Sequence, residues 1–386
     1  MISLVSDTIN KDDIKSLITW LEQDTIPRLT KGDLTIQLEN KWANKIGTKY
    51  CVYVNSGSSS ILLSLAALKY TGKLRNNKIV IPGLSWATDL SSPMLLNYDV
   101  HLCDCNLHDL SCDLDHLESI FKTESPAAMI LVSALGLVPD MDRVSDLCKK
   151  YEVILLEDVC ESMGSKYKEK YLGTFGFASF FSLYFGHHLS TIEGGFINTD
   201  DEEFYHLLLM MRSHGWDRDL PKHIQQHLRT KYNIDEFKSL YTFYVPGFNL
   251  RSTDLQAYLG ITAIDKLDTF AKNRNCNFES YLSNISNNLL TLTNARSNFI
   301  SNFAYPIMQK NRGGVVKELM DNKIEVRPLI AGNIANNPVW CNHYDFVKLK
   351  NCELVDECGF YVPNHQDLTE QDIKDICRIL NKDYEK

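Results

Sequence analysis

The sequence predicts an α/β protein whose main domain is a largely parallel sheet with helices on both faces. Continuous apolar runs at Lys78–Ile81, Ala128–Val132 and Glu152–Leu156 have the pattern of buried strands. Stretches with helical spacing at Leu114–Lys122 and Met141–Tyr151 alternate with them. Strands that are apolar throughout are typical of parallel sheets, because crossover helices cover both faces.

The segments before this core predict two helices, a strand and a third helix. Lys11–Glu22 repeats apolar residues at helical spacing, and Asp33–Ala43 is a second helical candidate. Lys49–Val54 is rich in β-forming residues and predicts a strand. The Gly/Ser turn Asn55–Ser60 then leads into an apolar helix at Ile61–Leu68.

The segments after the core predict a return strand, further helices and a second domain. We expect a strand at Phe196–Asp200 and helices at Glu203–Arg212 and Leu255–Lys266. Beyond them the pattern predicts a helix from about residue 267 to 289, a strand at Asn302–Ile307, a helix near Gly314–Asn322, a short apolar segment at Ile324–Val326 and a final helix near Thr369–Leu380. We therefore predict a large domain over residues 1–264 and a smaller α+β domain over residues 265–386.

Composition narrows the classes of function. The 386 residues are 44% hydrophobic and 23% charged, with 40 basic against 49 acidic residues, which gives a net charge of −9. No basic stripe is present to neutralise a nucleic acid backbone. The N-terminus has no signal-peptide pattern, and no apolar run approaches the length of a membrane span. We expect a cytoplasmic protein that binds neither nucleic acid nor membrane.

The cysteines raise the question of a metal site. Cys103 and Cys105 lie close to Cys112 among eleven scattered cysteines. The spacing matches no zinc pattern, and three such ligands have no fourth partner nearby in the sequence. Reduced thiols and no metal are therefore the expectation.

Polar residues follow the predicted strands, at the edge where parallel sheets bind ligands. They are a hydroxyl-rich helix start at Ser56–Ser60, Trp86, Asp158 and Ser182. A helix start of this kind can bind an anion, although a capped helix without a ligand has the same pattern. Together the set suits a phosphorylated pyridine cofactor: hydroxyls for the phosphate, an aromatic ring for stacking and an acid for the ring nitrogen.

Two adjacent histidines, His187 and His188, lie between an aromatic run and Glu193-Gly194-Gly195. Histidine is the side chain whose unperturbed pKa is closest to neutrality, which suits it to proton transfer. Either ring could instead be a buried structural group.

Motifs over nearly the whole chain resemble the sugar aminotransferases of the DegT/DnrJ/EryC1/StrS family. They are Ser56–Ser59, Ile81–Trp86, Leu135-Gly136 with Asp140–Asp142, Leu156–Asp158 with Glu161-Ser162, Gly173–Gly176, Ser179–Ser182, Glu193–Gly195 and Gly247–Arg251. The resemblance implies a type I, aspartate aminotransferase-like fold with a mainly parallel seven-stranded sheet and a smaller C-terminal α+β domain. It also implies a homodimer with shared active sites.

One position departs from the aminotransferases of this family. They carry a Schiff-base lysine six residues before the Glu-Gly-Gly, where this chain has His187. The resemblance then points to the 3-dehydratase subgroup that lacks the lysine, which the chain also matches in Ser213–Pro221, Arg327-Pro328, Ala331–Asn333 and Asn364–Gln366. Some related dehydratases carry an iron–sulfur cluster, but Cys352 and Cys358 lack obvious companions, so we expect none.

The resemblance assigns roles to individual residues. His187 is the expected catalytic base, with pyridoxal or pyridoxamine phosphate held without a lysine bond. The cofactor-binding set is Gly57, Ser58, Ser59, Trp86, Asp158, Glu161, Ser182 and, from the neighbouring subunit, Asn249. The substrate-binding set is His188, His214, Arg218, Arg251 and Arg327. Glu161 and His188 could equally be structural.

The implied reaction is removal of the C3 hydroxyl of a nucleotide-linked 4-keto-6-deoxyhexose, with glutamate as amino donor and ammonia as by-product. GDP is the nucleotide that the resemblance implies. A CDP- or dTDP-linked sugar, an aminotransferase-like outcome and a silent homologue that binds sugar nucleotides stay open as alternatives.

Overall fold

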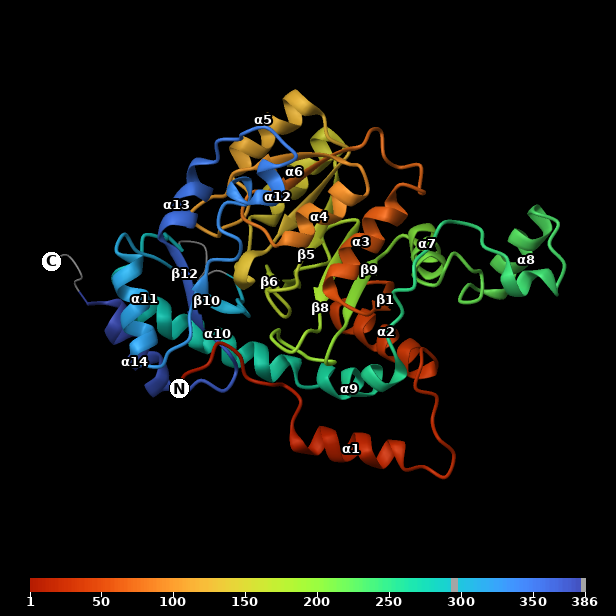
Figure 1. Ribbon diagram of the computed structural model, residues 1–386, viewed down its shortest axis with the longest axis horizontal. Helices are drawn as coiled ribbons and strands as arrows, with labels where there is room; N and C mark the ends of the chain where they lie inside the picture. Colours follow the sequence, from red (N-terminus) through yellow and green to blue (C-terminus); the bar gives the residue numbers. More distant parts are fainter. Residues whose placement is uncertain (293–297, 383–386) are drawn as a thin grey trace.

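The computed structural model describes residues 1–292 and 298–382, and its centre is a seven-stranded sheet (Figure 1). The strands lie in the order β1 (Tyr50–Val54), β9 (Gly195–Thr199), β8 (Ala178–Ser182), β5 (Ile154–Asp158), β4 (Ala128–Val132), β2 (Lys78–Pro82) and β3 (Asp99–Cys103). The pairs from β8 to β3 are parallel, whereas β9 runs antiparallel to both of its neighbours. The predicted fold class is confirmed.

Helices cover both faces of this sheet because the chain reverses its direction across it. The helices after β1 and β2, α3 (Gly57–Leu68) and α4 (Ala87–Leu95), contact each other, and α3 also contacts α7 (Glu202–Arg212). The helices after β3 and β4, α5 (Leu114–Glu124) and α6 (Met141–Tyr151), form a second contacting pair. Right-handed crossovers that run in opposite directions along a sheet place their helices on opposite faces.

Helices α2 (Asp33–Ile46) and α9 (Asp254–Ile264) pack against each other, and α2 lies against the sheet at β1, β9 and β8. Trp42 of α2 is fully buried between Phe181 and Phe196, with ring centroids 5.0 Å from each. Its indole nitrogen donates to Asn198 at 3.0 Å, so this large side chain buries no unpaired donor.

The C-terminal part forms a small antiparallel sheet in the order β10 (Ala304–Met308), β12 (Gly359–Pro363) and β11 (Arg327–Pro328). Its helices are α10 (Leu267–Asn284), α11 (Arg312–Asp321), α12 (Pro338–Cys341), α13 (Lys350–Cys358) and α14 (Glu370–Leu380). The predicted helix to residue 289 ends earlier, because Ile285 takes an extended conformation. The predicted domain boundary at residue 265 falls between α9 and α10 and stays a prediction.

Two helices lie away from the main body (Figure 1). Helix α1 (Lys11–Leu21) has no buried residue, although Trp20 stacks on Tyr258 of α9 at 4.9 Å. Helix α8 (Lys222–Lys231), which the sequence did not predict, projects from one side. A short hairpin of β6 (Lys166–Tyr167) and β7 (Lys170–Tyr171) completes the elements. Within the described residues, no helix combines the length and hydrophobicity needed to cross a membrane.

Candidate active site

A cavity of about 740 Å³ lies where the carboxyl ends of the parallel strands face the C-terminal part of the chain. Residues that follow or end five of the strands line it: Ser56 after β1, Trp86 after β2, Ser133 after β4, Asp158 in β5 and Ser182 in β8. Ligands of open α/β sheets bind at this edge, and the volume is that of a small-molecule site.

The turn from β1 into α3 provides an anion site at one end of the cavity. Ser56 is the N-cap of α3, and its hydroxyl accepts the Ser59 N–H at 3.0 Å. The N–H groups of Gly57 and Ser58 precede the first intrahelical bonds and face the cavity together with the positive end of the helix dipole. A Cβ at position 57 would come within 2.7 Å of the Ser182 Cβ, so only glycine lets the helix start this close to β8.

Trp86 is one of the aromatic residues of the cavity, and 56% of it is exposed. It precedes α4 as its N-cap residue, with its backbone N–H bound by the Asp89 carboxylate at 3.2 Å. An exposed indole beside a cavity offers a flat surface on which a planar ring can stack.

Asp158 ends β5 and is only 5% exposed. Its carboxylate accepts the Cys160 N–H at 2.9 Å, and burial raises the pKa of the carboxyl above its usual value. None of the ion pairs in the described part of the chain gives Asp158 a cationic partner. A buried acid that lines a cavity without a cation fits a protonated ring nitrogen, which would supply the missing charge.

Glu161 is the second acid of the cavity. Its side chain accepts the Leu135 N–H at 2.8 Å, and burial together with the nearby Asp158 raises its pKa to about 7. Because its pKa lies near neutrality, Glu161 can donate or accept a proton at the cavity wall.

His187 lies in the loop between β8 and β9 and lines the same cavity. The loop is closed by the Leu183 N–H bond to the Gly194 carbonyl at 2.9 Å, and the His187 N–H binds the Tyr184 carbonyl at 2.9 Å. The ring centroid lies 5.2 Å from that of Phe303.

The chemical state of His187 follows from its surroundings. Burial, and the positive charge of Arg274, lower its pKa to about 4. The Nδ1 atom is buried with no hydrogen-bond partner among the described residues. The neutral imidazole of a residue that lines a cavity can act as a base.

His188 lies outside the residues that line the cavity. Its side chain is 0% exposed, and its Nε2 binds the Ser301 carbonyl at 2.8 Å. Burial lowers its pKa well below the usual value, so the ring is neutral. His188 therefore packs in the interior, where its hydrogen bond links the β8–β9 loop to the segment before β10.

The predicted substrate-binding residues divide between two regions. Arg327, the first residue of β11, lines the cavity and can meet an anionic ligand there. His214 and Arg218 lie on the segment that leads to α8, where the Arg218 guanidinium lies 3.9 Å from the Trp216 ring centroid. The structure of one chain does not bring His214 or Arg218 to the cavity wall.

Three further predicted residues also lie outside the cavity wall of a single chain, namely Ser59, Asn249 and Arg251. The Ser59 hydroxyl accepts from that of Ser56 at 2.9 Å. Asn249 is exposed, and its amide oxygen accepts from the Arg251 Nε at 2.9 Å.

Several lining residues were not predicted from the sequence. The N-terminal residues Ser3–Val5 reach the cavity, and Glu325 accepts the Leu4 N–H at 2.9 Å. Phe303 and Tyr361 reach it from the C-terminal part. No local motif marks these positions, because packing between distant segments brings them to the cavity.

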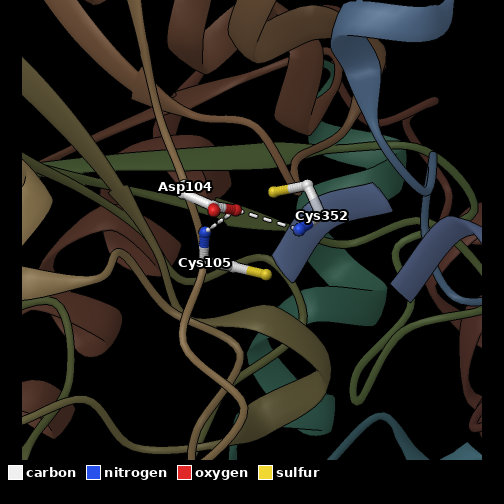
Figure 2. A group of neighbouring side chains, drawn as sticks. All are labelled: Asp104, Cys105 and Cys352. Carbon is white, nitrogen blue, oxygen red and sulfur yellow. Dashed lines mark hydrogen bonds between the residues drawn. The ribbon is translucent and has the colours of Figure 1, made fainter. Parts of the chain in front are cut away.

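A separate group of potential metal ligands consists of Asp104, Cys105 and Cys352, whose ligand atoms lie within 4.8 Å of one another (Figure 2). The Asp104 carboxylate accepts the N–H groups of Cys105 at 2.9 Å, Asn351 at 3.0 Å and Cys352 at 2.9 Å. It therefore caps the start of α13, whose own N-cap Leu349 has no side-chain acceptor.

The two thiols of this group have a structural explanation as well. The hydrogen bond that the Cys352 thiol donates to Cys105, with burial, raises the pKa of the Cys352 thiol. Within the described residues the group offers three ligands, whereas structural zinc takes four. We therefore interpret it as a helix cap and a thiol pair that join β3 to α13. The sequence had shown no partner for Cys105, because Cys352 lies far away along the chain.

Replacing Asp104 with alanine is expected to lower the free energy of unfolding by about 1–3 kcal/mol, because three backbone donors lose their acceptor. Asp115, whose side chain is 86% exposed beside Arg143, is the matched control. Asp115→Ala should cost only about 0–1 kcal/mol. Urea unfolding of the two variants measures both values, and equal losses would contradict the capping role.

The comparisons with known proteins agree with this geometry. The sequence profile described as the DegT/DnrJ/EryC1/StrS aminotransferase family matches residues 7–381. GDP-4-keto-6-deoxy-D-mannose 3-dehydratase of Yersinia pseudotuberculosis is 33% identical over 391 aligned residues, which cover 98% of each chain.

Two solved structures are similar over the same length. The Escherichia coli GDP-4-keto-6-deoxy-D-mannose 3-dehydratase with bound hydrated PLP has a TM-score of 0.88 and 31% identity, covering 98% of this chain and 99% of that one. A GDP-4-keto-6-deoxymannose 3-dehydratase with a trapped PLP–glutamate geminal diamine has a TM-score of 0.89 and 31% identity, covering 98% and 100%.

Proposed function

This chain belongs to the DegT/DnrJ/EryC1/StrS aminotransferase family, and from that membership we propose that it is a nucleotide-sugar 3-dehydratase. Its substrate is a GDP-linked 4-keto-6-deoxyhexose, and GDP-4-keto-6-deoxymannose is the sugar nucleotide that we propose. Its amino donor is glutamate. Two relatives support the proposal: one is a GDP-4-keto-6-deoxy-D-mannose 3-dehydratase, and the other holds a trapped PLP–glutamate geminal diamine. A cytoplasmic location is part of the proposal, since the eleven cysteines are free thiols and a reducing compartment keeps them so.

The observation that carries the proposal is His187 in a cavity whose described lining contains no lysine. Without a lysine amine in reach, the chain cannot hold a pyridoxal cofactor through a covalent bond, and it has a neutral imidazole instead. An imidazole moves protons but provides no amine for transfer. That difference favours dehydration over transamination.

The residues present fit pyridoxal or pyridoxamine phosphate, which when bound supplies an amine for the C4 ketone and an aromatic electron sink. The N–H groups of Gly57 and Ser58, with the Ser182 hydroxyl beside them, would hold the phosphate. Trp86 would offer its indole to the ring, and Asp158 would hold the ring nitrogen.

The remaining residues of the cavity act on the sugar. The neutral ring of His187 would take up the proton from the amine-bearing carbon of the cofactor and return it to the departing C3 hydroxyl oxygen, which leaves as water. Arg327 offers its guanidinium to the diphosphate of the nucleotide. Phe303 and Tyr361 keep water from the reacting atoms.

The test is an incubation of the protein with pyridoxal phosphate, glutamate and one sugar nucleotide at a time from a GDP-, CDP- and dTDP-linked 4-keto-6-deoxyhexose panel. We expect equal amounts of 2-oxoglutarate, ammonia and 3-deoxy sugar with the GDP-linked substrate. A 4-amino sugar without ammonia would indicate an aminotransferase, and no turnover would indicate a silent homologue. Trapping of the cofactor on a lysine by borohydride would contradict the proposal.

We further propose that the enzyme is a homodimer in which Asn249 completes the phosphate site of the neighbouring subunit. Asn249 is exposed in the single chain, and the segment around α8 exposes the large apolar side chains of Phe237, Tyr241 and Phe243. Exposed apolar groups on a projecting element suit burial against a second chain.

Light scattering is expected to give twice the mass of the 44.2 kDa chain. Mixing inactive Asn249→Ala and His187→Asn chains should restore part of the activity, because one of the two hybrid sites is then intact. A monomer with full activity, or no recovery in mixed dimers, would contradict the shared site.

A further inference from the structure

A second buried acid, Asp89, lies beside Asp158. It is the third residue of α4, it is 0% exposed, and its carboxyl group lies within hydrogen-bonding reach of that of Asp158. Its Oδ2 accepts the Trp86 N–H at 3.2 Å. Its Oδ1 is buried, and the described part of the chain presents no donor to it.

Two ionised carboxylates cannot share a hydrogen bond, because both offer only acceptors. One of the pair must therefore carry a proton. The other titratable groups that face the pair are Cys160 and Glu161, and neither can supply a positive charge to stabilise a second anion.

The geometry assigns the proton to Asp89, which lies outside the cavity wall and has a buried Oδ1 to which the described residues present no donor. Burial first, and then the charge of Asp158, raise the pKa of Asp89 well above its usual value, and one backbone N–H only partly offsets this. Asp158 is the partner that lines the cavity, accepts the Cys160 N–H and can meet a cation there. Neighbouring carboxyl groups with unequal surroundings divide in this way into an acid and an anion.

We propose that Asp89 is a positioning residue: a protonated acid that donates a hydrogen bond to Asp158 and thereby keeps the proton of a bound pyridine ring on the ring nitrogen. The inference rests on the proposed pyridoxal phosphate site and deepens it. A hydrogen bond donated to an anion lowers the affinity of that anion for a further proton. Asp158 is then a weaker base than it would be alone, and the ring keeps its proton.

Two substitutions separate this role from simple packing. Asp89→Asn keeps an uncharged donor for Asp158 and an acceptor for the Trp86 N–H, whereas Asp89→Ala removes both. The probe is pyridoxal phosphate labelled with ¹⁵N at the ring nitrogen, whose chemical shift reports protonation, together with its dissociation constant. No sugar substrate is needed.

We expect the wild-type protein and Asp89→Asn to hold a protonated ring nitrogen at neutral pH with similar affinity. Asp89→Ala should shift the nitrogen signal toward the neutral form and weaken binding by roughly 10- to 100-fold, the range for one hydrogen bond to a charged group. If Asp89→Asn changes the signal as much as Asp89→Ala does, Asp89 acts as an anion and the inference is wrong. An unchanged signal in Asp89→Ala would overturn it as well.

Infrared spectroscopy of the protein without cofactor gives an independent answer that holds even if the alanine variant fails to fold. The wild-type minus Asp89→Asn difference spectrum should contain the carbonyl band of a protonated carboxylic acid at neutral pH. Its absence would overturn the inference without touching the proposed function. Failure of the wild-type protein to bind pyridoxal phosphate would instead contradict the proposed function, while the band would still report on the acid pair.

Discussion

Replacing His187 with asparagine is expected to reduce dehydration by roughly 10²- to 10⁴-fold, the usual contribution of a positioned acid–base group. Asparagine is polar and fits the space of the imidazole, but it cannot take up and return a proton. Release of ammonia from the GDP-linked substrate measures the rate. Binding of pyridoxal phosphate should be unchanged, because the phosphate turn and Asp158 are untouched.

His188 provides the matched control, since it is an adjacent histidine with the same chemistry and no access to the cavity. His188→Asn should lose about 1–3 kcal/mol of stability with its bond to the Ser301 carbonyl, yet retain turnover. Equal loss of turnover in both variants would show that turnover depends on the structure of the loop and not on proton transfer by the His187 ring.

The pH dependence follows from the same ring. The pKa of His187 is lowered to about 4, so its unprotonated, basic form persists through neutral pH. Protonation of this base removes activity only as the pH falls toward about 4. A rate that declined near neutral pH would contradict this prediction and would point either to Glu161, whose pKa is about 7, or to a His187 pKa raised on ligand binding.

The sequence predicted the residues at the strand ends because a parallel sheet brings those ends to one edge. Trp86, Asp158 and Ser182 are far apart in the chain, yet each ends a strand or follows one within four residues, and the structure brings them to the same cavity. His187 could be placed there for the same reason, since its loop joins the neighbouring strands β8 and β9.

Other parts of the site depend on packing that leaves no local pattern. Ser3–Val5 and Tyr361 reach the cavity from the two ends of the chain, and the sequence contains no motif that pairs them with the sheet. The Asp89–Asp158 contact is of the same kind, because a lone acid in the first turn of a helix is ordinarily a capping residue. Its burial against a second acid is visible only in three dimensions.

Replacing Asp158 with asparagine is expected to lower turnover by roughly 10²- to 10³-fold, the cost of removing one preorganised electrostatic partner. The amide keeps the size of the side chain but has no negative charge to hold a protonated ring nitrogen. The ¹⁵N signal of bound pyridoxal phosphate should move to the neutral form, and its affinity should fall.

The neighbouring residue Glu157 is the control for this substitution, because successive strand residues point to opposite faces of a sheet. Its carboxylate is buried but binds the N–H groups of Gly173, Phe175 and Gly176 at 2.6–2.8 Å, so its role is structural. Glu157→Gln should therefore lower the unfolding temperature and leave the ring nitrogen protonated. If Asp158→Asn instead left both the nitrogen signal and the turnover unchanged, the proton would have to be held elsewhere, and Glu161, Glu193 and Glu325 are the other acids of the cavity. Asp158 and Glu157 are both buried acids of β5, but only Asp158 lines the cavity. If only Asp158→Asn loses the protonated ring nitrogen, the negative charge at the cavity is what makes the ring an electron sink.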